Sequence, residues 1–213
     1  MRRGWVSKLS DPQRRLRYGG RKLLVLLLAA ALVGGVHVAD RFGVFGRART
    51  PDHEKYNGKV FRVVHVVDGD TLDVEIRDEV RRKPATRIRL WGVDTPETVD
   101  PRKPKPDHFG PEASAFTKDL ANDANVRLEL DPVSTRDKYE RLLAYVILPD
   151  GRMLNRVLVE EGYAYADPRF PHKYKREFEK LMKQAKTAGR GLWKDVRPED
   201  LPDYLHSEKL PVR

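Results

Sequence analysis

Hydrophobic and polar residues alternate along several short stretches of this chain, a pattern typical of β-strands with one buried face. Val60 to Val67 and Thr71 to Arg77 are separated by Asp68-Gly69, a tight-turn dipeptide, so they predict a hairpin. Three further strands are expected at Thr86 to Val93, at Val126 to Leu130 and at the more uniformly apolar Leu142 to Leu148.

Helical patterns fall between and after these strands. Gly110-Pro111-Glu112 places a proline at the first helical position, and apolar residues follow at helical spacing as far as Ala124. A short helix is expected to end at Gly162, and a longer one to span about Lys173 to Ala188, with Gly189 as its stop. The order of three strands, helix, two strands and two helices predicts an α+β, mainly β fold, built on a five-stranded Greek-key barrel of the OB type.

The N-terminal part has a different pattern, in which a basic stretch precedes an apolar one. Leu23 to Val36 contains no charged residue, and residues 1–22 carry eight Lys and Arg. At about 1.5 Å per residue, the apolar stretch is close to the length of a ~30 Å hydrocarbon core and overlaps that of a signal-peptide core. We expect a basic cytoplasmic leader at 1–22 and a hydrophobic helix at 23–39, which is either an uncleaved signal-anchor or a cleaved signal peptide. A buried core helix is a weaker alternative, because the basic flank orients the segment in a membrane.

These segments set the expected organisation of the rest of the chain. Residues 40–57 are expected to be a polar linker, residues 58–194 the folded domain and residues 195–213 a C-terminal tail. The domain is expected to be a monomer and to lie outside the cytoplasm. If the anchor remains, the domain is expected in the periplasm or at the cell surface; if the segment is cleaved, the domain is expected to be secreted. The absence of cysteine fits these compartments and excludes disulfides, thiol catalysis and cysteine-ligated zinc.

The formal net charge of +10 does not by itself indicate a nucleic-acid partner. The first 50 residues contain 11 of the 42 Lys and Arg and two acids, which leaves 31 basic and 30 acidic side chains in the remainder. The excess of positive charge therefore belongs to the N-terminal segment.

Three polar clusters carry the candidate chemistry. They are Asp68-Gly69-Asp70-Thr71, Arg89 with Asp94-Thr95-Pro96-Glu97, and Asp137-Lys138-Tyr139-Glu140-Arg141. Carboxylates are the ligands that hard divalent cations prefer, arginines present forked donors to phosphate oxygens, and a glutamate can orient a water. Each cluster alone could be a turn with capping aspartates, an exposed loop glutamate or solvated arginines. Their occurrence together predicts a site that cleaves a phosphodiester.

These clusters, with two further motifs, resemble the staphylococcal nuclease, or thermonuclease, family. The resemblance spans about Gly58 to Trp193. Its motifs are Asp68-Gly69-Asp70-Thr71, Arg89 with Asp94-Thr95-Pro96-Glu97-Thr98, Gly110-Pro111-Glu112-Ala113-Ser114-Ala115-Phe116-Thr117-Lys118, Asp137-Lys138-Tyr139 with Arg141, and Gly191-Leu192-Trp193.

The resemblance implies a metal-assisted hydrolase. It implies a calcium ion as the cofactor, bound by Asp70, Asp94 and the main-chain carbonyl of Thr95, and it gives Glu97 the catalytic role of orienting or deprotonating water. A site with only two formal charges is expected to bind calcium weakly, in the roughly millimolar to tenth-millimolar class.

The resemblance also assigns the residues that contact the substrate. Arg89 and Arg141 are expected to be catalytic, as donors to the phosphate, and Lys138 and Tyr139 to contact the nucleotide. The expected function is a calcium-dependent nuclease that cleaves DNA and RNA, single strands most readily, by in-line attack of water, leaving 3'-phosphate ends.

Two other functions have to be compared with this one. The first is a non-catalytic module on the same fold that binds nucleic acid or protein; it predicts tight single-strand binding without turnover. The second is a membrane-tethered scaffold, which explains residues 23–39 but leaves the polar clusters without a role.

Overall fold

The structure, a computed structural model, describes residues 51–98, 105–132 and 134–206. The expected leader, the hydrophobic segment 23–39 and most of the linker lie outside these ranges. Within the described ranges, no helix has the length and apolar character needed to span a bilayer. The elements are α2 (Pro51–Tyr56), β1 (Val60–Asp68), β2 (Thr71–Val74), β3 (Thr86–Leu90), β4 (Val93–Asp94), α3 (Gly110–Ala121), β5 (Asn125–Leu130), β6 (Leu142–Ile147), α4 (Leu154–Glu160), β7 (Tyr165–Ala166), α5 (Lys175–Ala188), the 3₁₀ turns η1 (Gly191–Lys194) and η2 (Pro198–Asp200), and α6 (Asp203–His206).

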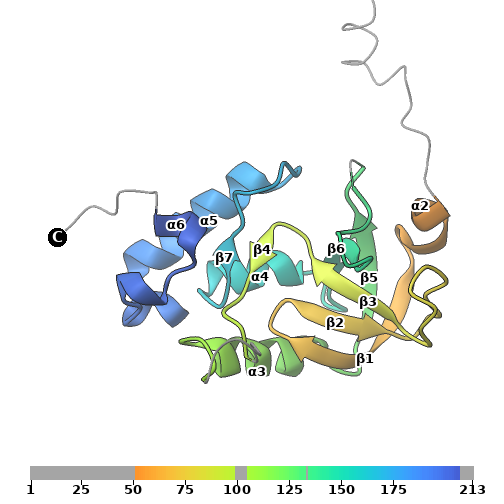
Figure 1. The fold of residues 1–213 in the computed structure, drawn as a ribbon, viewed down its shortest axis with the longest axis horizontal. Helices are drawn as coiled ribbons and strands as arrows, with labels where there is room; N and C mark the ends of the chain where they lie inside the picture. Colours follow the sequence, from red (N-terminus) through yellow and green to blue (C-terminus); the bar gives the residue numbers. More distant parts are fainter. Residues whose placement is uncertain (1–50, 99–104, 133, 207–213) are drawn as a thin grey trace, which may run out of the picture. The chain divides into compact units, whose positions relative to one another are not determined.

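Five strands close into a barrel in the order β1-β2-β3-β6-β5, with β5 paired back onto β1. All neighbours are antiparallel except β3 and β6, which run parallel with Ile88 opposite Leu142. The helix α3 separates the third strand from the last two along the chain and packs against β1 (Figure 1). The expected mainly β fold with a five-stranded OB-type barrel is confirmed.

The core follows from the alternation seen in the sequence. The core includes residues at alternate strand positions that are fully buried: Leu72, Val74, Ile88 and Leu128. The residues between them on the same strands carry the polar groups. All six residues of β6 are buried, because this strand faces the barrel interior on one side and is covered by helices on the other.

The third predicted strand is interrupted in the structure. It was expected to run from Thr86 to Val93, but β3 ends at Leu90 and the chain turns at Trp91 and Gly92. Gly92 has φ +78°, and a Cβ there would collide with the ring of His172. The turn sends Asp94 off the barrel, where β4 pairs with β7.

The expected linker 40–57 ends in an ordered helix. Helix α2 (Pro51–Tyr56) packs on the barrel, Tyr56 is only 1% exposed, and its hydroxyl lies 3.2 Å from Thr86 Oγ1. The amide of Gly58 then donates to the carbonyl of Leu128 at 2.7 Å. The structured domain therefore includes residues 51–57, which the sequence pattern did not reveal because a single buried tyrosine gives no periodicity.

The expected tail 195–213 is also ordered over much of its length. The turn η2 and the helix α6 follow η1, and Leu201 and Leu205 are buried in a small second cluster with Tyr165 and Leu192. Figure 1 shows α6 beside α5, on the side of the domain that carries β7 and β4. This segment is part of the domain and not a free tail.

Asn155 fastens β6 to the turn that precedes β4. Its carboxamide oxygen accepts the amide of Val146 at 3.0 Å, and its nitrogen donates to the carbonyls of Trp91 at 3.0 Å and Ala144 at 3.3 Å. Because Asn155, Val146 and Ala144 are all fully buried, water cannot readily replace the bonds that Asn155 makes to these two strand residues.

We expect Asn155→Ala to lower the free energy of unfolding by about 1–3 kcal/mol, since it leaves buried polar backbone groups unpaired. Urea denaturation would measure the loss. Asn122→Ala is the matched control, because the Asn122 side chain is exposed and bonds only its neighbour Asp123. Equal stabilities for the two variants would contradict this role for Asn155.

Candidate active site

The turn between β1 and β2 forms the floor of the candidate site. Gly69 lies so close to Thr95 that a Cβ there would be 2.7 Å from Thr95 Oγ1, and its carbonyl accepts the Thr117 hydroxyl of α3 at 2.6 Å. The next residue, Asp70, is only 5% exposed. Its two oxygens accept the Thr95 amide at 2.9 Å and the Thr71 hydroxyl at 3.0 Å. The turn therefore holds the Asp70 carboxylate in one orientation, against the end of β4.

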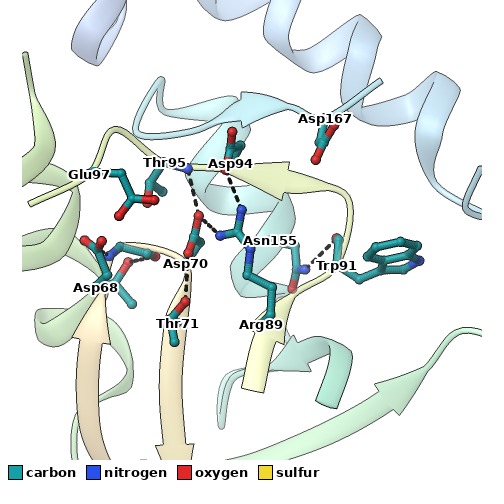
Figure 2. Close-up of polar contacts among 12 residues, drawn as sticks. Asp68, Asp70, Thr71, Arg89, Trp91, Asp94, Thr95, Glu97, Asn155 and Asp167 are labelled. Carbon is teal, nitrogen blue, oxygen red and sulfur yellow. Dashed lines mark hydrogen bonds and ion pairs between the residues drawn. The ribbon is translucent and has the colours of Figure 1, made fainter. Parts of the chain in front are cut away.

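Arg89 lies between two carboxylates. It points from β3 toward Asp70 on the hairpin and Asp94 on β4, and its guanidinium forms ion pairs with both (Figure 2). The Arg89 side chain is only 14% exposed. The neighbouring Arg87 instead makes two bonds to Asp73, at 2.8 and 2.9 Å. Of the two strand arginines, only Arg89 reaches the candidate metal ligands.

The second oxygen of Asp94 is bonded by residues from the C-terminal part of the domain. Asp94 Oδ2 accepts the Tyr204 hydroxyl at 2.7 Å and Arg169 Nη2 at 3.1 Å. Sequence reasoning missed both residues. Tyr204 lies 110 positions from Asp94, and no periodic pattern or motif connects the two.

Glu97 points from the loop after β4 into the same space as Asp68 and Asp70 (Figure 2). Burial raises the pKa of Glu97 to about 7, assisted by a hydrogen bond to Asp68 and by the negative charges of Asp68 and Asp94, and opposed by the charge of Arg89. A carboxyl with this pKa can exchange a proton near neutral pH. Asp68 was part of the predicted motif but was given no role; the structure makes it the partner of Glu97.

Arg141 is positioned by a braced turn. Asp137 Oδ2 accepts Arg141 Nε at 2.7 Å, and Glu140 between them is left-handed, with φ +61°. Arg136 ties this turn to helix α2, because it donates to the Glu140 carbonyl at 2.8 Å and pairs with Asp52 of α2 at 2.9 Å. The helix found in the expected linker thus supports a candidate catalytic residue.

Two grooves meet at the carboxylates. One, of about 410 Å³, is lined by Asp68, Asp70, Glu97, Tyr139 and four arginines, Arg81, Arg87, Arg89 and Arg141. The other, of about 920 Å³, has six acidic residues in its lining: Asp94, Glu97, Asp107, Glu199, Asp200 and Asp203. The smaller groove brings four arginines to the candidate site, of which Arg81 and Arg87 were not predicted, whereas the lining of the larger groove includes one arginine, Arg169.

The nucleotide contacts expected at Lys138 and Tyr139 lie at the rim of the arginine-lined groove. The Tyr139 ring is 62% exposed. The Lys138 ammonium lies 4.9 Å and the Arg141 guanidinium 5.5 Å from the centre of that ring. Tyr139 lines the groove, whereas Lys138 only flanks it.

The donor chemistry fits a hard divalent cation. Asp70 and Asp94 present carboxylate oxygens to the same guanidinium, so both face one small volume. Thr95 is buried next to Asp94 and is tied to Asp70 through its amide. Within the described ranges, no group of three or more His, Cys, Asp and Glu side chains could hold a metal. A cation here would therefore need backbone oxygen and water as further ligands.

Comparisons with known proteins agree with this geometry. The family described as "Staphylococcal nuclease homologue" matches residues 87–195. The chain is 36% identical over 171 residues to the thermonuclease of Staphylococcus hyicus, an alignment that covers 80% of this chain and 95% of the relative. It is 39% identical over 173 residues to the thermonuclease of Staphylococcus intermedius, covering 79% and 95%. It is 38% identical over 121 residues to endonuclease YncB of Bacillus subtilis, covering 55% and 53%. With its barrel, its motifs and these matches, the chain belongs to the staphylococcal nuclease family.

Proposed function

We propose that this chain is a calcium-dependent nuclease that hydrolyses DNA and RNA and leaves 3'-phosphate ends. Membership of the staphylococcal nuclease family supports the coarser statement that it is a nuclease, since its relatives are named thermonuclease and endonuclease. The observation that carries the finer proposal is the convergence of Asp70, Asp94, Arg89 and Glu97 beside an arginine-lined groove.

Calcium would be held by Asp70, Asp94 and the Thr95 carbonyl. When bound, the ion supplies positive charge that stabilises the negative charge developing on the phosphate. Arg89 already neutralises part of the negative charge of the two carboxylates, so they would attract a cation only weakly. This supports an affinity of the order of tenth-millimolar to millimolar, a class typical of extracellular modules.

Arg89 and Arg141 are proposed to bind the scissile phosphate. A guanidinium donates two parallel hydrogen bonds to phosphate oxygens, and these strengthen as the oxygens gain charge in the transition state. Both side chains line the smaller groove, and Asp137 fixes Arg141 from its Nε side. The groove therefore offers two guanidinium groups to a phosphate: Asp137 sets the position of Arg141, whereas Arg89 would have to share donors that now pair with Asp70 and Asp94.

Glu97 is proposed to orient the attacking water or to accept its proton. Its pKa of about 7, raised mainly by burial and by Asp68, means that the group can switch between its two forms near neutral pH. In-line attack on the phosphorus with departure of the 5'-oxygen would place the new oxygen on the 3'-phosphate.

The nucleic-acid strand is proposed to follow the arginine-lined groove. Its guanidinium groups suit a phosphate backbone, and the exposed Tyr139 ring with Lys138 beside it suits a sugar or base. The larger, acid-lined groove would repel the strand. A flexible single strand is expected to be cleaved more readily than a duplex, because Arg89 and Arg141 must both contact one exposed phosphate. A single copy of the chain contains all the proposed groups.

Residues 23–39 are proposed to hold the chain in a membrane with the nuclease domain outside the cytoplasm; secretion after signal cleavage is the alternative. The basic leader 1–22 and the apolar run support this placement.

We expect Arg89→Ala to reduce calcium-dependent cleavage of single-stranded DNA about a thousandfold, because an arginine that stabilises phosphoryl charge contributes on this scale. Arg62→Ala is the matched control, since Arg62 is exposed and, among the residues that the structure describes, its side chain pairs with Asp123 alone. This variant should retain full activity. Asp70→Ala and chelation of calcium should each abolish cleavage. Tight single-strand binding without turnover at millimolar calcium would instead favour a non-catalytic binding module.

The pH dependence of kcat/KM, measured at subsaturating calcium, should have an acidic limb with its midpoint near 7, because Glu97 acts in its deprotonated form and burial raises its pKa. Glu97→Gln should remove the limb together with most of the activity. Asp68→Asn should move the limb to lower pH, since Asp68 raises the pKa of Glu97. Asp123→Asn, at the surface, should leave it in place; a limb unaffected by Asp68→Asn would rule out this assignment.

In spheroplasts of a Gram-negative host that expresses the whole chain, we expect added protease to degrade the nuclease domain while a cytoplasmic marker stays intact. If the domain is shielded until the membrane is lysed, the proposed outward placement is wrong.

A further inference from the structure

The two oxygens of Asp94 have different surroundings. Oδ1 pairs with Arg89 and faces the side where Asp70 lies. Oδ2 accepts two hydrogen bonds from the opposite side, from Tyr204 at 2.7 Å and from Arg169 at 3.1 Å. Tyr204 and Arg169 therefore hold Asp94 through Oδ2, while Oδ1 faces the candidate site.

The residues that bond Oδ2 are themselves fixed. Arg169 is held by Asp167, which accepts bonds from its Nε and Nη2, both at 2.8 Å. The Arg169 guanidinium lies 4.1 Å from the centre of the Tyr204 ring, a stacked cation–π contact. Asp167 is only 7% exposed and directly follows β7, the strand that pairs with β4. Asp94, Arg169 and Tyr204 thus form one braced unit.

Hydrophobic packing brings Tyr204 to this place. Its neighbour Leu205, and Leu201 one turn earlier, are 5% and 7% exposed and pack with Tyr165 of β7 and with Leu192. The chain from residue 195 to 206, hereafter the C-terminal segment, is therefore anchored independently of the Tyr204 hydroxyl.

We propose that Tyr204, with Arg169, is a positioning residue of the nuclease site: it orients Asp94 for cation binding and so makes the C-terminal segment a working part of that site. Groups that hydrogen-bond the non-ligating oxygen of a metal-binding carboxylate fix its rotamer and its orientation toward the metal. Their loss typically weakens metal binding about 10- to 100-fold. The inference rests on the proposed function, in that it takes Asp94 as a cation ligand. It excludes the opposite role, in which the segment withholds Asp94 from the cation as a latch.

The test compares the whole chain, purified in detergent, with Tyr204→Phe, which removes one hydroxyl and keeps the ring under Arg169. Calcium binding is followed by isothermal titration with the inorganic ion alone. We expect Tyr204→Phe to bind calcium at least about tenfold more weakly than the parent chain does. Melting of the calcium-free protein should stay close to that of the parent chain, because Leu201 and Leu205 still anchor the segment.

Tyr163→Phe is the matched control, since the Tyr163 ring stacks on Phe116 at 3.9 Å and lies outside the linings of both grooves. It should bind calcium as the parent does. In an Asp94→Asn background, Tyr204→Phe should have no further effect on calcium binding, because it acts only through Asp94. In cleavage assays the calcium concentration for half-maximal rate should rise in Tyr204→Phe, while the rate at saturating calcium changes less.

Unchanged calcium affinity in Tyr204→Phe would overturn the inference, and tighter binding would show a latch instead. In both of these cases the parent chain still binds calcium and cleaves, so the proposed function stands. If the parent chain itself neither binds millimolar calcium nor cleaves, the proposed function fails and this inference fails with it.

Discussion

The pairing of Arg89 with Asp70 and Asp94 is the interaction on which the rest of the site depends. Two carboxylates that face one small volume repel each other, and both are largely removed from water, with side-chain exposures of 7% and 19%. The buried guanidinium offsets this repulsion and keeps the oxygens directed at a common point. The charge of Arg89 also lowers the pKa of Glu97, against the stronger effects of burial and Asp68. We propose that the same charge makes the binding of a cation weak.

Asp70, Arg89 and Asp94 come together because the barrel strand β3 ends early and the chain leaves the barrel after it. The barrel supplies Arg89 from β3 and Asp70 from the turn that precedes β2, with Thr71 of β2 opposite Arg89. Asp94 is delivered only because the chain turns at Gly92 and then pairs with β7 outside the barrel. Asn155 ties the backbone of that turn to β6, and the close approach of Gly69 to Thr95 brings the hairpin under β4. The site is therefore the place where the five-stranded barrel meets the two-stranded sheet of β4 and β7.

Sequence reasoning reached the elements and contacts that are local or periodic. Alternation predicted most of the barrel strands, and a run of apolar residues predicted β6. Motif spacing selected Arg89 and not Arg87, which the structure pairs with Asp73. It failed where a contact joins distant segments through single side chains. Tyr56 and Tyr204 stand in segments without periodicity, so α2 was taken for linker and α6 for tail. The partnership of Asp68 with Glu97 depends on the path of the loop after β4, which no pattern in the chain encodes.

We propose that Glu97 directs water at a phosphate that Arg89 and Arg141 hold in the arginine-lined groove. Cleavage of a single-stranded oligonucleotide in ¹⁸O-labelled water, with mass analysis of the products, tests it most directly. We expect calcium-dependent products with one ¹⁸O in a terminal 3'-phosphate and an unlabelled 5'-hydroxyl on the partner fragment. Label in a 5'-phosphate, or products without label, would contradict it.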